Sequence, residues 1–241
     1  MILLRQSVML DDAGQSVLPS PLICARHLNK SFNSSGVSID ILKSADFELK
    51  PGETVAVTGA SGIGKSTFLH ILGTLDRPDT GTLLFKGKDV FGFDDTRLAK
   101  FRNESVGFVF QFHHLLSEFS AIENVMIPAL INGQSKKEGK EIAEAILVRV
   151  GLEERLSHMA DRLSGGEQQP VAIARALVLN PPLLLADELT GNLDQKNSDH
   201  IHMLLLELNK ELGMSLVLVT HNAELASYMS RSLTIVDGKI V

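Results

Sequence analysis

A glycine-rich loop between a strand and a helix is the feature that most constrains the fold of this chain of 241 residues. Thr54–Thr58 is a β-branched run typical of a buried strand. The next residues fit the pattern G-x-x-x-x-G-K-[ST]; they are Gly59, Ala60, Ser61, Gly62, Ile63, Gly64, Lys65 and Ser66. The helix expected after them carries Phe68, Leu69, Ile71, Leu72 and Leu75 at the spacing of one buried stripe. The alternative is a chance glycine turn, which the strand–loop–helix context disfavours.

A loop of this kind binds phosphate. Its glycines let successive backbone N–H groups turn inward on phosphate oxygens, and the helix N-terminus adds positive potential. Lys65 is expected to reach the β and γ phosphates of a nucleotide, and Ser66 to coordinate Mg²⁺.

Two adjacent carboxylates follow a second buried strand. Leu183–Ala186 has no polar alternation, as in a parallel sheet covered on both faces, and Asp187 and Glu188 come directly after it. Ligands collect at the carboxyl ends of such strands. Asp187 is therefore expected to bind Mg²⁺, directly or through water, and Glu188 to polarise a water that attacks the γ-phosphate. The alternative is a pair of solvated acids that begin a loop.

Composition limits the classes of function. The chain is 44% hydrophobic and 22% charged, which is typical of a globular protein, and its net charge of −6 disfavours a nucleic-acid partner. The single cysteine, Cys24, excludes an internal disulfide. No run of 18 apolar residues is present, so we expect a cytosolic chain that contacts a membrane only through partners.

The chain divides into two parts by pattern. Residues 1–20 have no clear period and are interpreted as a leader, and residues 21–241 as one nucleotide-binding domain. Short strand-like runs at Leu22–Leu28, Ala45–Lys50 and Thr82–Lys86 predict an N-terminal antiparallel β layer. A capping box at Ser135 and Glu138 predicts the start of a helix. We therefore expect an α-helical subdomain inserted at about residues 112–165.

A further capping box pairs Ser164 with Glu167, so a helix is expected to start with Gly165 and Gly166, small residues that expose its N–H groups. Spacing alone leaves two interpretations, an anion site or an ordinary helix cap. Leu163–Gln169 followed by Val171–Leu177, however, resembles the signature motif of ABC-type ATPases. The resemblance covers roughly residues 22–241, where several motifs follow in the family's order.

The resemblance implies an ABC ATPase fold: an α/β P-loop NTPase (RecA-like) core with the antiparallel β layer and the inserted helical subdomain. It implies an ATPase with ATP and Mg²⁺ as cofactors, which forms a head-to-tail homodimer on ATP binding. Ser164, Gly165, Gly166 and Glu167 of one subunit would close over ATP held by residues 59–67, including Thr67, of the other.

Four more residues match family motifs. Gln111 resembles the Q-loop residue that senses Mg²⁺ and the attacking water, and His221 resembles the switch histidine at the γ-phosphate. Asp194 resembles the D-loop aspartate, and Phe32 the aromatic residue that stacks on adenine. Each alone is open to a structural explanation: a polar loop residue, a packed histidine or a core ring.

A narrower resemblance rests on Phe108–Leu116, Glu118–Phe119, Glu123–Val125 and Asp187–Asp194. These segments are similar to ATP-binding subunits of lipoprotein-releasing transporters, in a group that includes macrolide-exporter and cell-division ATPases. The resemblance implies a peripheral location on the cytoplasmic face of the inner membrane. It also implies that integral membrane subunits dock near Phe112–Phe119, for which a plain core segment is the alternative. A macrolide or peptide exporter and a dimerising cell-division switch remain alternative functions.

Four positions depart from the family pattern: Ile63, Leu189, Asn222 and Pro170. Ile63 lies between the cradling glycines and is expected to point outward. Pro170 stands where the family has arginine, and as the sixth residue of the signature helix it lacks a needed N–H donor. We therefore expect a kink or a displaced start in this helix and weaker closure of the dimer on ATP.

Overall fold

The computed structural model describes residues 9–10, 16–17, 20–34, 37–191 and 193–241. After an N-terminal run of strands, helices and strands follow one another along the chain, except that α3, α4 and α5 have no strand between them. The strands are β1 (Met9–Leu10), β2 (Ser16–Val17), β3 (Ile23–Ser34), β4 (Val37–Leu49), β5 (Thr54–Thr58), β6 (Thr80–Phe85), β7 (Lys88–Asp89), β8 (Val106–Val109), β9 (Leu183–Asp187), β10 (Ser215–Val219), β11 (Arg231–Val236) and β12 (Lys239–Ile240). The helices are α1 (Lys65–Leu72), α2 (Asp95–Ser105), α3 (Ala121–Ile131), α4 (Lys136–Arg149), α5 (Gly165–Leu177), α6 (Gln195–Leu212) and α7 (Ala223–Ser227).

A six-stranded sheet forms the centre, in the order β12-β11-β5-β10-β9-β8. Its strands are parallel except for β12, which pairs antiparallel with β11. Every residue of β10 is buried, as expected for a strand covered on both faces. The carboxyl ends of β5, β9 and β10 therefore meet at one edge of the sheet, where the loops after them come together.

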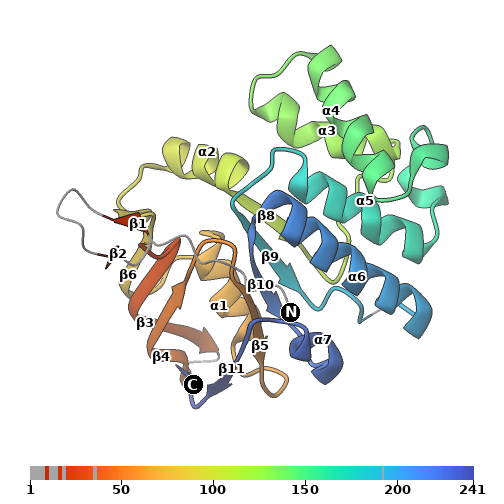
Figure 1. Ribbon diagram of the computed structural model, residues 1–241. Coiled ribbons are helices and arrows are strands. Elements are labelled where there is room, and N and C mark those ends of the chain that lie inside the picture. The colour runs from red at the N-terminus through yellow and green to blue at the C-terminus, as the bar shows by residue number, and fades with distance from the viewer. Residues whose placement is uncertain (1–8, 11–15, 18–19, 35–36, 192) are drawn as a thin grey trace.

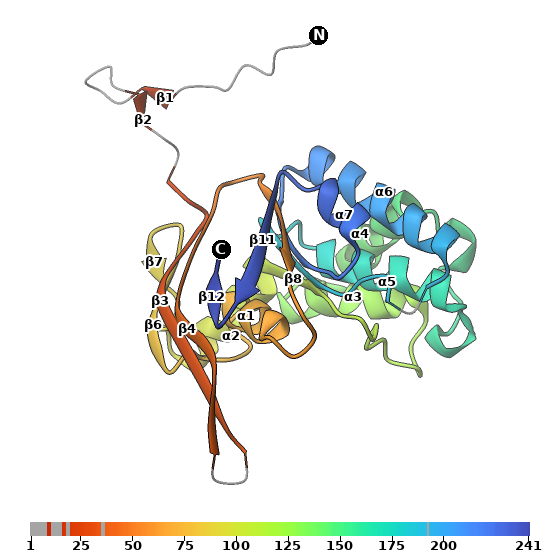
Figure 2. The same ribbon diagram turned by 90° about the horizontal axis from the view of Figure 1, so that it is seen from below.

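A second, antiparallel sheet has the order β4-β3-β6-β7. It lies at one end of the molecule, and helices α3 and α4 lie at the other (Figure 1). The same separation holds in the perpendicular view, where β3 and β4 form a long hairpin (Figure 2). Strands β3 and β4 extend well beyond the runs expected from the sequence, so the hairpin carries Phe32 and Ile39 as a cross-strand pair.

Two hydrophobic cores lie in the described part of the chain. One joins the antiparallel sheet to α1 and the central sheet, with Phe68 and Phe47 edge to face at 5.3 Å between ring centroids. The other joins the central sheet to α3, α4, α5 and α6. Helix α1 ends at Leu72 and Gly73 is its C-cap, so Leu75, expected in the buried stripe, is instead 48% exposed.

The signature helix begins where its capping box predicts. Helix α5 starts at Gly165, directly after Ser164, and runs through Pro170 to Leu177. Of the two alternatives expected for Pro170, a displaced helix start is therefore wrong, because the box at Ser164 and Glu167 fixes the first turn. A kink remains a prediction.

Candidate functional site

The loop between β5 and α1 has the backbone of a phosphate cradle. Gly59, Gly62 and Gly64 have φ angles of +140°, +76° and +108°. Residues with a side chain rarely adopt such angles. A Cβ at Gly64 would also collide with the side chain of Ile41 on β4. Both the turn and the close approach of β4 therefore require glycine here.

Lys65 closes this loop on itself. Its ammonium donates hydrogen bonds to the carbonyl oxygens of Gly59, at 3.0 Å, and Ala60, at 2.9 Å, and the residue is only 9% exposed. Incoming phosphate oxygens are stronger acceptors than neutral carbonyls for a charged donor. The lysine is thus held in the cradle, ready to exchange its loop partners for an anion.

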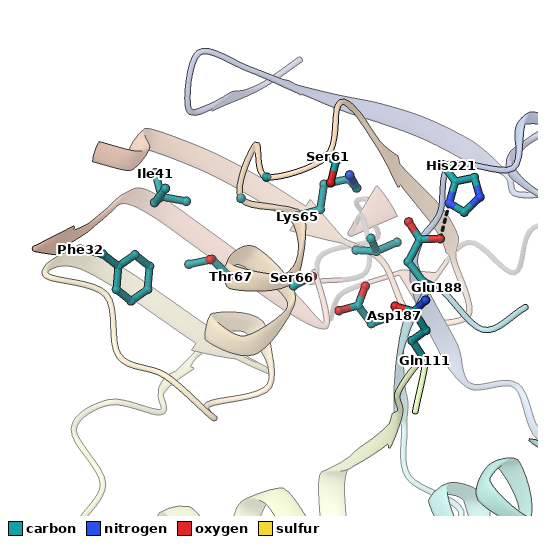
Figure 3. A pocket seen from close by; sticks show the side chains of 13 residues that line it. Phe32, Ile41, Ser61, Lys65, Ser66, Thr67, Gln111, Asp187, Glu188 and His221 are labelled. Atoms are coloured by element: carbon teal, nitrogen blue, oxygen red, sulfur yellow. Dashed lines mark ion pairs between the residues drawn. The ribbon is translucent and has the colours of Figure 1, made fainter. Parts of the chain in front are cut away.

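An open pocket of about 500 Å³ lies against the loop. Most of the residues that the sequence singled out line it, together with two that it did not, Ile41 and Val219. The lining is Phe32, Ile41, Ser61, Gly62, Gly64, Lys65, Ser66, Thr67, Gln111, Asp187, Glu188, Val219 and His221. Figure 3 shows Phe32 and Ile41 at one end, Glu188 and His221 at the other, and Lys65 between them.

Asp187 ends β9 with an unused acceptor. Its Oδ1 is buried and has no hydrogen-bond partner in the part of the chain that the structure describes. Such an atom costs free energy unless something binds it. Because Asp187 faces the pocket beside Ser66 and Gln111 (Figure 3), this oxygen fits a ligand for a hard cation such as Mg²⁺.

Glu188 is turned by a left-handed backbone conformation, with φ +48°. Its N–H donates to the carbonyl of Val219 at 3.0 Å, which ties the end of β9 to the end of β10. The carboxylate Oε2 lies 2.5 Å from Nδ1 of His221, the second residue after β10. A left-handed backbone conformation at a non-glycine residue is strained and persists only where surrounding contacts hold it. At Glu188 this conformation directs the carboxylate along the pocket wall.

Gln111 reaches the pocket from the segment that follows β8. Its side chain packs against Gly191, where an added Cβ would lie 3.0 Å from Nε2. Glycine at 191 thus lets the loop after Glu188 approach Gln111 closely. The loops after β8, β9 and β10 consequently meet at one wall of the site.

Several expected residues lie outside this pocket. Gly59 and Ala60 contribute carbonyls to Lys65, and Ile63 does not line the pocket but packs against the core. Asp194 caps α6, accepting from the backbone N–H of Asn197 at 2.9 Å. The signature residues do not line the pocket of their own chain either.

The start of α5 is a rigid polar cluster. The Ser164 hydroxyl donates to Glu167 Oε2 at 2.7 Å, the Ser164 N–H donates to the same oxygen at 2.9 Å, and Arg155 Nε donates to Oε1 at 2.7 Å. The Ser164 hydroxyl, followed by Arg155, lowers the pKa of Glu167 to about 2. Glu167 is therefore an ionised carboxylate that stabilises this helix start. It accepts hydrogen bonds from Ser164 and not from the N–H groups of Gly165 and Gly166.

Sequence reasoning missed Ile41 and Val219. Val219 is the last residue of β10, a strand in which every residue is buried. Ile41 lies on β4 between Asp40, which pairs with Ser31, and Leu42, which pairs with Lys30, so it is the extra residue at an irregularity of the β3–β4 pairing. Strand alternation read from the sequence would not have placed Ile41 in the site.

Comparisons with known proteins agree on one family. The family described as "ABC transporter" matches residues 42–191. The chain is 54% identical over 222 residues to the lipoprotein-releasing system ATP-binding protein LolD of Geobacter metallireducens, covering 92% of this chain and 99% of the relative. It is 52% identical over 220 residues to the protein of the same name from Syntrophus aciditrophicus, with 91% and 99% covered.

The fold agrees as well. A dimeric structure of a post-hydrolysis state of the ATP-binding cassette MJ0796, bound to ADP and Pi, superposes with a TM-score of 0.84 at 37% identity and covers 90% of this chain and 96% of that one. The fold and the loop therefore define a P-loop ATP-binding cassette, which confirms the expected fold class. More particularly, the chain belongs to the ABC transporter family, and the relatives named here are LolD proteins.

Proposed function

We propose that this chain is the ATP-hydrolysing subunit of a lipoprotein-releasing ABC transporter. The observation that carries the proposal is the convergence of Lys65, the unused oxygen of Asp187 and the Glu188–His221 pair on one pocket (Figure 3). The cargo follows from the names of relatives at 54% and 52% identity over nearly their whole length.

The pocket accommodates ATP along its length. Phe32 and Ile41 form the apolar end for the adenine, and the N–H groups of residues 59–67 cradle the phosphates. Lys65 leaves the carbonyls of Gly59 and Ala60 for the β and γ phosphates. Ser66, Gln111 and Asp187 would hold Mg²⁺, which when bound offsets phosphate charge.

Glu188 acts on the attacking water. Its carboxylate accepts a proton from the water as the oxygen approaches the γ-phosphate, and His221 holds the carboxylate in place through Nδ1. Gln111 orients the same water from the same wall of the pocket, where its side chain packs against the loop after Glu188.

The site is completed by a second copy of the chain. Ser164, Gly165 and Gly166 lie outside their own pocket at the start of α5, where the N–H groups of Gly165 and Gly166 fit the γ-phosphate held by the partner. The structural relative MJ0796 is described as a dimer. Asp194, the N-cap residue of α6, would lie at the same contact between the two subunits.

Membrane subunits dock on the segment Phe112–Phe119. Phe112 is 66% exposed, and Leu116 and Phe119 are also exposed, so the segment is not buried in the core. Beside it lies a depression of about 260 Å³ lined partly by α5, through Gln168. None of the helices within the described residues is long and apolar enough to cross a membrane. We therefore place the chain on the cytoplasmic face of the inner membrane, attached through these subunits.

The test is ATP hydrolysis by the chain alone and with the membrane subunits captured from native membranes. We expect Mg²⁺-dependent release of phosphate that the captured subunits change, and release of lipoprotein from reconstituted vesicles only when ATP is supplied. Capture of an exporter of macrolides, with no lipoprotein release, would contradict the cargo. Absence of hydrolysis in the complex would contradict the function.

A further inference from the structure

The ammonium of Lys30 is held beside the aromatic ring at the apolar end of the pocket. Lys30 Nζ lies 5.1 Å from the centroid of the Phe32 ring, within the range of a cation–π interaction. The Phe32 residue is 45% exposed and lines the pocket, so its ring offers surface to a ligand as well as to the cation.

The position of this ammonium is fixed by two other contacts. Nζ donates to Asp76 Oδ1 at 2.8 Å and to the carbonyl of Arg77 at 2.8 Å, and the Lys30 side chain is only 12% exposed. Asp76 and Arg77 belong to the loop that follows α1. An exposed lysine would sample many rotamers, whereas this one is anchored at its charged end.

These contacts join the phosphate loop to the apolar end of the pocket through one helix. Helix α1 starts at Lys65 and Ser66, which line the pocket at the loop, and the chain just beyond its end holds Lys30. Phe32 lies near the end of the β3–β4 hairpin, where it pairs with Ile39 and is 45% exposed. Lys30 constrains the Phe32 ring from the side of α1.

We propose that Lys30 is a positioning residue that sets the Phe32 ring for stacking on the nucleotide base. The proposal rests on the proposed function, because it assumes that Phe32 receives the adenine of ATP. The cation attracts the negative face of the ring, which fixes the ring plane and leaves it less repulsive toward the π face of a base. Lys30 itself touches no phosphate.

The experiment is a double-mutant cycle read with two ligands. Calorimetry measures the binding of MgATP and of magnesium tripolyphosphate, which has no base, to the full chain, Lys30→Met, Phe32→Ala and the double variant. We expect Lys30→Met to weaken MgATP binding roughly threefold to tenfold and to leave tripolyphosphate binding unchanged. In the Phe32→Ala background, Lys30→Met should change MgATP binding less than twofold, because its effect passes through the ring.

Three further variants complete the experiment. Lys30→Arg, which keeps a cation, should recover most of the MgATP affinity, and Lys88→Met removes an exposed lysine of the same sheet and should change nothing. Asp76→Asn weakens the ion pair that holds the Lys30 ammonium, so it should lower the affinity for MgATP and leave tripolyphosphate binding unchanged. This variant replaces Lys30→Met in the experiment if Lys30→Met fails to fold.

An equal loss for both ligands, or a full effect of Lys30→Met without the Phe32 ring, would overturn the proposal. So would MgATP affinity that neither substitution changes. Failure of the unmodified chain to bind either ligand would instead contradict the proposed function itself.

Discussion

The imidazole Nδ1 of His221 and the carboxylate Oε2 of Glu188 lie 2.5 Å apart, although 32 residues separate them in the sequence. The two side chains come from the ends of adjacent parallel strands, β10 and β9, so the sheet itself sets their separation. The pair gives Glu188 a fixed orientation in the pocket and makes it the first residue to test.

Glu188→Gln should abolish turnover and preserve ATP binding. The amide keeps the size of the side chain but cannot accept the proton of the water, so we expect kcat to fall roughly 10²–10⁴-fold. Phosphate release and calorimetric binding of MgATP measure the two properties. Glu224→Gln, on α7, is the control and should retain activity. Normal turnover in Glu188→Gln would remove Glu188 as the base.

Replacement of Pro170 should strengthen α5 and raise the ATPase rate. A residue with an N–H at 170 can donate to the carbonyl of Gly166, and the proline costs about 3 kcal/mol at an interior helical position. We expect Pro170→Ala to raise the free energy of unfolding, and Pro170→Arg, which restores the family residue, to raise ATPase activity. Thermal unfolding and phosphate release are the measurements.

Pro128 offers the control, because it lies inside α3, away from the signature residues. Pro128→Ala should stabilise the chain without a change in ATPase rate. An unchanged or lower rate for Pro170→Arg would contradict the idea that this proline weakens closure of the dimer.

The pH dependence of stability should carry a contribution from Glu167. Hydrogen bonds from Ser164 and Arg155 lower its pKa to about 2 in the folded chain, below the ordinary value of 4.5. A carboxylate with a lowered folded pKa stabilises the fold above its unfolded pKa and loses this contribution as the pH falls through the folded one. The difference in unfolding free energy between the parent and Glu167→Gln should therefore be constant above about pH 5 and shrink toward pH 2. A difference independent of pH would contradict the assignment.

Arg175 should hold the segment after Gln111 in place. Its guanidinium on α5 donates to the carbonyls of His113 and His114, each at 2.7 Å, and His114 has a left-handed φ of +47°. Burial lowers the pKa of Arg175, and the two charge-assisted bonds compensate for that burial. Arg175→Met should lower the free energy of unfolding by about 3 kcal/mol.

The same substitution should speed amide hydrogen exchange in residues 112–116. Arg162→Met, an exposed arginine near the start of α5, is the control and should leave both stability and exchange unchanged. Unaltered exchange in Arg175→Met would show that other contacts hold the segment.

Local signals predicted much of the fold. The glycine loop before Lys65, the acids at the end of β9 and the capping boxes at Ser135 and Ser164 each depend on neighbouring residues, and each lies where the sequence placed it. Helix α2 and strand β8 were not anticipated. Leu98 is the one buried residue of α2, so that helix has no apolar stripe to recognise.

Strand β8 depends on a long-range contact. Its Gly107 packs so closely on α5 that a Cβ would lie 2.5 Å from the carbonyl oxygen of Ala176. A glycine in so short a run argues against a strand. Only the close packing of α5 explains why glycine stands at position 107.

The site shows the same division between local and distant signals. Spacing identified Lys65, Ser66, Asp187 and Glu188, whose roles follow from adjacent strands and loops. The partnership of Glu188 with His221 and the place of Phe32 opposite Ile39 depend on strand pairing, which the sequence alone does not fix. For Gln111, His221 and Phe32, the family resemblance supplied what local chemistry could not.

The central claim is that the loop before Lys65 receives the triphosphate of a nucleotide. Calorimetric titration of MgATP into the purified chain and into Lys65→Ala tests it most directly, with Lys88→Ala as the control. We predict measurable binding by the parent and the control, and an affinity lower by roughly tenfold or more for Lys65→Ala, because charge-assisted bonds to phosphate are lost. Binding by Lys65→Ala as tight as that of the parent, or no heat from the parent, would contradict the claim.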